Sequence, residues 1–165
     1  MNKQILITIS GIIIAISVFF LLANYSVPTG QKSGDTPGPL VLLAPETFYD
    51  FGDVSMAKGN VMHNFKIVNN SGQPASISRI YTSCMCTEAK LMMGGESFGP
   101  YGMPGHGLVS SINKTMVPGS EADIETIFDP AAHGPAGVGP VERIIYVETE
   151  NGAPLELKFR ANVTP

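Results

Sequence analysis

Two cysteines, Cys84 and Cys86, lie one residue apart and are the only cysteines in the chain. They close a segment, residues 75–86, whose residue pattern predicts a β-strand. Alternate residues of an extended strand point to the same face, so both thiols should project together from Cα atoms about 6–7 Å apart. That separation is at the limit for a disulfide and favours shared ligation of a metal ion.

Further soft donors follow the cysteine pair. Residues 102–107 hold Met103 and His106 between glycines and a proline, and this composition lets the backbone turn tightly and bring both side chains toward the thiols. Thiolate and thioether ligands favour Cu(I), whereas thiolate with imidazole also suits Zn(II). The sequence therefore predicts a metal site, with copper favoured, formed by Cys84, Cys86, Met103 and His106.

The other two histidines have more ordinary interpretations. His63 alternates with Phe65 and Ile67 on one strand face, which is typical of a partly buried histidine in a sheet. His133 lies in a segment rich in Ala, Gly and Pro, which predicts a solvated loop. Both nevertheless map to the end of the predicted sandwich that holds the cysteines.

Other interpretations of the cysteine pair stay open. Cysteines of exported proteins usually form a disulfide, and a bridge between Cys84 and Cys86 would close a strained, easily reduced ring. A redox role normally needs a helix N-terminus or a cation beside the thiol, and the nearest cations in the sequence are Arg79 and Lys90. A third possibility is a metal-free scaffolding or interaction domain that binds a partner along an exposed edge strand.

Composition excludes two classes of function. The net charge is −4 and no Lys/Arg cluster occurs, so nucleic acid is not an expected partner. No Gly-x-Ser-x-Gly turn or distinctive acid/base pair is present, so we do not expect an enzyme.

The first residues predict a membrane anchor. Residues 5–23 carry no charge and are long enough to span a bilayer, and Lys3 before them predicts that the chain after them is extracytoplasmic. The exit of this stretch is a poor cleavage site, which favours an uncleaved single-pass anchor. We expect an anchor or signal segment over residues 1–24, a Pro/Gly-rich linker over 25–40 and one domain over 41–165, with the membrane and an exported protein as partners.

From residue 40 onward, short alternating segments are separated by turn residues, and no helical periodicity is sustained. The fold class predicted is all-β: an immunoglobulin-like seven-stranded antiparallel sandwich preceded by one N-terminal transmembrane helix. An up-and-down barrel is the alternative. Residues 91–98 predict a small added hairpin. The predicted strands cover residues 46–54, 60–69, 75–86, 108–112, 122–128, 141–149 and 155–163.

Several segments occur in a familiar order: residues 48–54, 58–59, 63–72, 83–87, 118–119 and 128–130. Together they resemble a bacterial family of exported proteins, the domain of unknown function numbered 1573, related to Hydin-like immunoglobulin-type domains. The resemblance covers about residues 46–163, and its most specific element is Ser-Cys-x-Cys-Thr at residues 83–87. It implies a seven-stranded sandwich, often secreted or membrane-anchored, with no settled activity. The sequence departs from the family in having Met85 where Gly is usual and in an expansion over residues 94–106.

Overall fold

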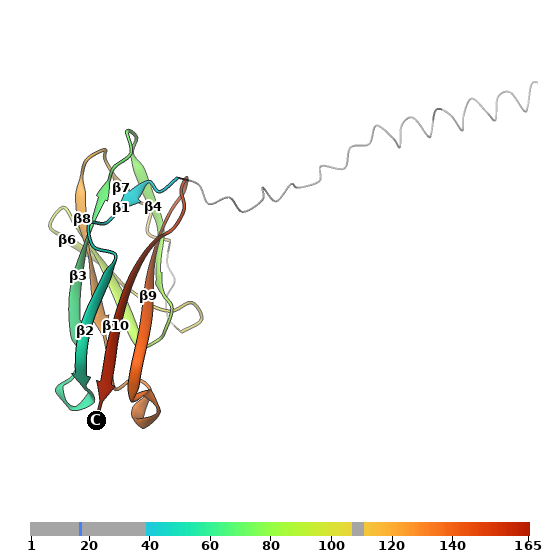
Figure 1. Ribbon diagram of the computed structural model, residues 1–165. Helices are drawn as coiled ribbons and strands as arrows, with labels where there is room; N and C mark the ends of the chain where they lie inside the picture. The colour runs from blue at the N-terminus through green and yellow to red at the C-terminus, as the bar shows by residue number, and fades with distance from the viewer. Residues whose placement is uncertain (1–16, 18–38, 107–110) are drawn as a thin grey trace, which may run out of the picture. The chain divides into compact units, whose positions relative to one another are not determined.

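Two β-sheets of five strands each form the domain (Figure 1). The structure is a computed structural model, and it describes residues 17, 39–106 and 111–165. The first sheet has the order β1 (Leu42–Leu43), β3 (Val61–Asn69), β8 (Glu121–Phe128), β5 (Thr87–Met93) and β6 (Glu96–Tyr101). The second has the order β2 (Phe48–Ser55), β10 (Leu155–Thr164), β9 (Gly139–Thr149), β4 (Ala75–Thr82) and β7 (Lys114–Met116). Two short 3-10 segments, η1 (Met56–Lys58) and η2 (Gly134–Gly137), lie in connections.

The all-β sandwich is confirmed, but the described residues form ten strands where seven were predicted. The hairpin predicted over residues 91–98 is confirmed, since β5 and β6 pair antiparallel, and it extends the first sheet because β5 also pairs with β8. Strand β5 pairs along β8, and its alternating Thr87, Ala89 and Leu91 are buried. Residues 87–101 are therefore part of the sandwich itself.

The strand predicted over residues 75–86 ends early, at Thr82. Beyond it the chain leaves the second sheet, turns, and enters the first sheet as β5 at Thr87. The turn is closed by a hydrogen bond from Thr87 N–H to Cys84 O of 3.1 Å. Both cysteines thus lie in a crossover between sheets and not in a strand.

The core lies between the two sheets. In strand β10, apolar residues alternate with polar ones, so one face of the strand is buried, and Leu157 and Phe159 are fully buried. From the first sheet, Phe65 and Ile124 are fully buried as well. Rings of Phe159 and Phe128 lie 5.2 Å apart across the core.

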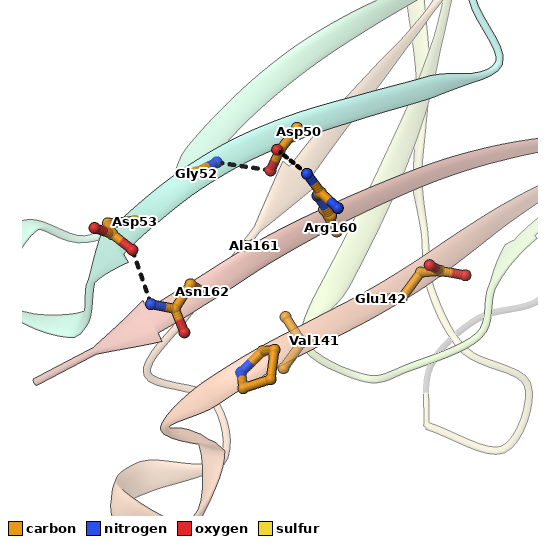
Figure 2. A pocket seen from close by; sticks show the side chains of 9 residues that line it. Asp50, Gly52, Asp53, Val141, Glu142, Arg160, Ala161 and Asn162 are labelled. Carbon is orange, nitrogen blue, oxygen red and sulfur yellow. Dashed lines mark hydrogen bonds and ion pairs between the residues drawn. The ribbon is translucent and has the colours of Figure 1, made fainter.

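The prediction that all strands are antiparallel is wrong for one edge. Strand β2 pairs in parallel with β10, with a register irregularity between Arg160 and Asn162. On the outer face, Arg160 Nη2 donates to Asp50 Oδ2 over 2.8 Å and Asn162 donates to Asp53 (Figure 2). These side chains line a groove together with Glu142 of β9, so Glu142 points away from the core.

Three predictions fall wholly or partly outside the described residues. The anchor over residues 1–24 and the linker over 25–40 do so except for residues 17, 39 and 40. Within the described part of the chain, no helix has the length and apolar character needed to cross a bilayer. Of the strand predicted over 108–112, residues 108–110 are not described, and the next strand is β7, which pairs with Ala75–Ile77 of β4.

We predict that Phe65→Ala lowers the free energy of unfolding by about 3–5 kcal/mol, because it opens a cavity between the sheets that neighbouring side chains cannot fill. Phe48→Ala is the matched control, since Phe48 is 44% exposed, and should cost less than about 1 kcal/mol. Urea denaturation of the purified protein followed by circular dichroism measures both. Equal losses would contradict this placement of the core.

Candidate metal centre

The turn that carries the cysteines is held on both sides by buried threonines. Thr82 and Thr87 are 1% and 0% exposed, and Thr82 Oγ1 lies 3.0 Å from Cys84 O and 2.9 Å from Thr87 O. Ser83 exchanges hydrogen bonds with Ile144 of β9, as its N–H donates to Ile144 O and its Oγ accepts from Ile144 N–H. The position of the cysteines is therefore set by contacts to both sheets.

Three donor atoms meet at this turn. The Cys84 and Cys86 sulfurs lie 2.8 Å apart, and Cys84 Sγ lies 3.1 Å from His133 Nε2. All three ligand atoms lie within 4.8 Å of one another. Cys86 is buried, Cys84 is half-buried and His133 is exposed, so the group opens to solvent on the His133 side.

A cation completes the surroundings of the thiols. Arg143 Nε donates to Cys86 Sγ over 3.1 Å, and its Nη1 donates to Glu142 O over 2.8 Å. Arg143 lies in β9, opposite Phe159 of β10. It therefore occupies a position that alternates with buried Ile145 and faces inward, unlike its neighbour Glu142.

These contacts move the pKa values of the two thiols in opposite directions. Burial raises the pKa of Cys84, but hydrogen bonds from the thiol and backbone N–H of Cys86 and from His133, together with the charge of Arg143, outweigh it and lower the pKa to about 7. Burial, reinforced by the hydrogen bond to Cys84, raises the pKa of Cys86 above its usual range. Cys84 therefore loses its proton first as the pH rises, while Cys86 keeps its own.

The predicted site residues are only partly brought together. Cys84 and Cys86 meet, through a turn and not through strand alternation. His106 is not a member of the group formed by Cys84, Cys86 and His133. Its N–H bonds to Met103 O over 3.1 Å, so residues 103–106 form a tight turn, and the His106 side chain is exposed. Gly102 O accepts from Thr82 N–H, which starts this turn beside the cysteine segment, and Met103 as a ligand stays a prediction.

His133 was interpreted as a solvated loop residue. Its side chain is exposed, yet the loop is drawn to the cysteines because Asp129 N–H donates to Cys86 O over 2.9 Å. One indication of the contact between His133 and Cys84 was available in the sequence, namely the prediction that His133 and the cysteines lie at the same end of the sandwich. His63 behaves as predicted: its side chain is 19% exposed, stacks on Tyr49 and pairs with Glu46.

Arg143 was missed altogether. Its signal is a charged residue at an inward position of the alternating run 141–147, where Val141, Ile145 and Val147 are apolar. If residues 141–147 form a strand, this pattern places the guanidinium of Arg143 against the core. The sequence alone could not say which group it meets there.

The fold and the thiol group define a two-sheet β-sandwich of the immunoglobulin-like kind that carries a cysteine-rich turn between its sheets. The family described as "Protein of unknown function (DUF1573)" has a model that matches residues 42–94, which span β1 to β5 and both cysteines. The resemblance seen in the sequence is thus confirmed over this part of the chain. Among curated proteins, none matches the sequence.

Solved structures resemble this chain in fold at low sequence identity. A protein of unknown function from Porphyromonas gingivalis W83 is 14% identical with a TM-score of 0.54, and the match covers 74% of this chain and 46% of that one. The chain thus spans under half the length of that protein. The secreted serine protease VesC from Vibrio cholerae is 12% identical with a TM-score of 0.48, over 76% of this chain and 24% of that one. An ASH/PapD-like domain of human CEP192 is 12% identical with a TM-score of 0.46, over 84% and 96% of the two chains.

We predict that alkylation of Cys84 by iodoacetamide reaches half its maximal rate near pH 7, because the thiolate is the reactive form and the pKa is lowered to about 7. Cys86 should react only at higher pH, since its pKa is raised. Peptide mapping by mass spectrometry separates the two sites.

His133→Ala should raise the pH at which alkylation of Cys84 is half-maximal, because the thiolate loses a hydrogen bond. His63→Ala, which removes a histidine that stacks on Tyr49, is the control and should leave it unchanged. If alkylation of Cys84 in the unaltered protein is half-maximal at the pH typical of an ordinary thiol, the proposed electrostatics of the turn are refuted.

Proposed function

We propose that this domain binds one soft metal ion, Cu(I), through Cys84, Cys86 and His133. The observation that carries the proposal is the gathering of two sulfurs and one imidazole nitrogen within 4.8 Å. Thiolate and imidazole are the donors that soft and borderline metal ions prefer. Binding would deliver or sequester the ion, and no catalytic step is proposed with it.

The number of donors favours Cu(I) over a structural Zn(II). Closed zinc sites are four-coordinate, with bonds of about 2.0–2.3 Å to nitrogen and sulfur. Among His, Cys, Asp and Glu in the described residues, this group has three members. The donors must also separate slightly to enclose an ion, because the sulfurs lie only 2.8 Å apart. Cys84 is half-buried and His133 is exposed, so the donors that can move away from the buried Cys86 sulfur lie on the solvent side.

The N-terminal sequence supports a location for this activity. Residues 5–23 are uncharged and Lys3 precedes them, so we propose a single-pass anchor that holds the domain outside the cytoplasm. An exported protein that receives or supplies the ion would be the partner.

The reduced protein, titrated with Cu(I) against a competing chelator, is expected to bind one equivalent. Cys84→Ser and Cys86→Ser should each weaken binding at least about 100-fold, because even the outer partners of metal ligands are worth 10–100-fold. His133→Gln should weaken it as well, and His106→Gln is the matched control.

The two histidine variants discriminate between ligand sets. If His106→Gln weakens binding and His133→Gln does not, the set inferred from the sequence, with Met103 and His106, replaces the one proposed here. Failure of the reduced protein to bind Cu(I) would remove the metal proposal and leave a metal-free interaction domain of the cell envelope. Binding unchanged in the double cysteine variant would also overturn the proposed site, because the ion would then be held elsewhere.

A second candidate, thiol–disulfide exchange, is favoured by one specific observation. Arg143 and His133 are cationic or donor groups in contact with the thiols, and such groups are what reactive thiolates require. The Cys84 thiolate would attack one sulfur of a substrate disulfide and release the first thiolate. Cys86, on losing its proton, would then attack Cys84 and release the second. The substrate is reduced by two electrons and the Cys84–Cys86 pair is oxidised.

For this candidate we predict a two-dalton loss assigned to a Cys84–Cys86 bridge after incubation with a small disulfide, because each turnover removes two hydrogen atoms from the pair. Cys86→Ser should instead accumulate a mixed disulfide on Cys84, since the second thiol is missing. Intact-mass spectrometry and peptide mapping measure both. If the two thiols stay unmodified under these conditions, exchange is excluded.

A further inference from the structure

We propose that Arg143 determines the charge selectivity of the thiol site, favouring a monovalent ion, Cu(I), over a divalent one such as Zn(II). This inference rests on the function proposed above and assigns a role to a residue that is not itself a ligand.

The position of Arg143 calls for an anion. It lies at an inward-facing place in β9, opposite buried Phe159 and in alternation with buried Ile145 and Val147. An inward charge is unfavourable unless an opposite charge meets it. In the described part of the chain, the ion pairs are made by other residues, and the side chain that meets Arg143 is Cys86.

Arg160 in the neighbouring strand β10 shows the contrast. It points to the outer face and pairs with the carboxylate of Asp50 at 2.8 Å (Figure 2). Arg143 has a thiol in place of the carboxylate, with Nε 3.1 Å from Cys86 Sγ. The natural counter-charge of Arg143 is therefore the thiol centre itself.

The net charge of the occupied site differs between the two metals. Two thiolates and a neutral imidazole carry −2, and Arg143 brings the local sum to −1. Cu(I) makes this sum zero, whereas Zn(II) makes it +1, with the extra positive charge next to the guanidinium. Like charges at contact distance repel, and the repulsion grows with the charge of the ion, so Arg143 penalises the divalent ion more than the monovalent one.

The test compares Cu(I) and Zn(II) affinities of the full chain by chelator competition. Arg143→Gln removes the charge and keeps a hydrogen-bond donor, and the ratio of Cu(I) to Zn(II) affinity should fall about tenfold, because the repulsion that weakens Zn(II) binding is lost. Arg143→Lys keeps the charge and should keep the ratio within about twofold. Because both metals need the same two thiolates, the free energy of deprotonating them cancels in the ratio.

Arg160→Gln is the matched control, since it removes an arginine of the same sheet that faces away from the core, and it should leave the ratio unchanged. If Arg143→Gln does not fold, Arg143→Leu takes its place, because an apolar side chain suits an inward position. An unchanged ratio in the uncharged variant overturns the inference while the proposed function stands. An unaltered protein that binds neither metal overturns both.

Discussion

The site depends on the way the chain crosses from one sheet to the other between β4 and β5. A strand that continued to Cys86 would keep the two side chains on one face with their Cα atoms apart. The buried hydroxyl of Thr82 instead lies against the carbonyls of Cys84 and Thr87, and the turn brings the sulfurs to 2.8 Å. The contact to Thr87 O is buried, and it is a strong constraint because a buried hydroxyl left without a partner would cost about 1–3 kcal/mol.

The same crossover recruits the other groups of the site. Asp129 N–H donates to Cys86 O, which holds the loop after β8 against the turn and brings His133 to Cys84. Ser83 is paired with Ile144, so β9 runs alongside and Arg143 reaches Cys86. Three segments far apart in the sequence thus meet through backbone hydrogen bonds, and the side chains follow.

The electrostatics make the two thiols unequal. Cys84 is half-buried and its pKa is lowered to about 7, while Cys86 is buried and its pKa is raised. Ligation of a soft ion and nucleophilic exchange both use an accessible thiolate beside a second sulfur. The two candidate functions therefore draw on the same geometry, and they differ in whether an ion or a substrate disulfide reaches Cys84.

Sequence pattern alone determined the β-sandwich, because alternation such as that of Leu155, Leu157 and Phe159 has one physical outcome, an apolar face buried against another sheet. It also singled out Cys84 and Cys86, whose type and spacing carry chemistry wherever they lie. Tertiary structure decided the companions of the thiols: His133 in place of His106, and Arg143 from a strand 57 residues away. Local patterns register only neighbours in the chain, whereas these contacts arise from how two sheets and three connections pack at one end of the sandwich.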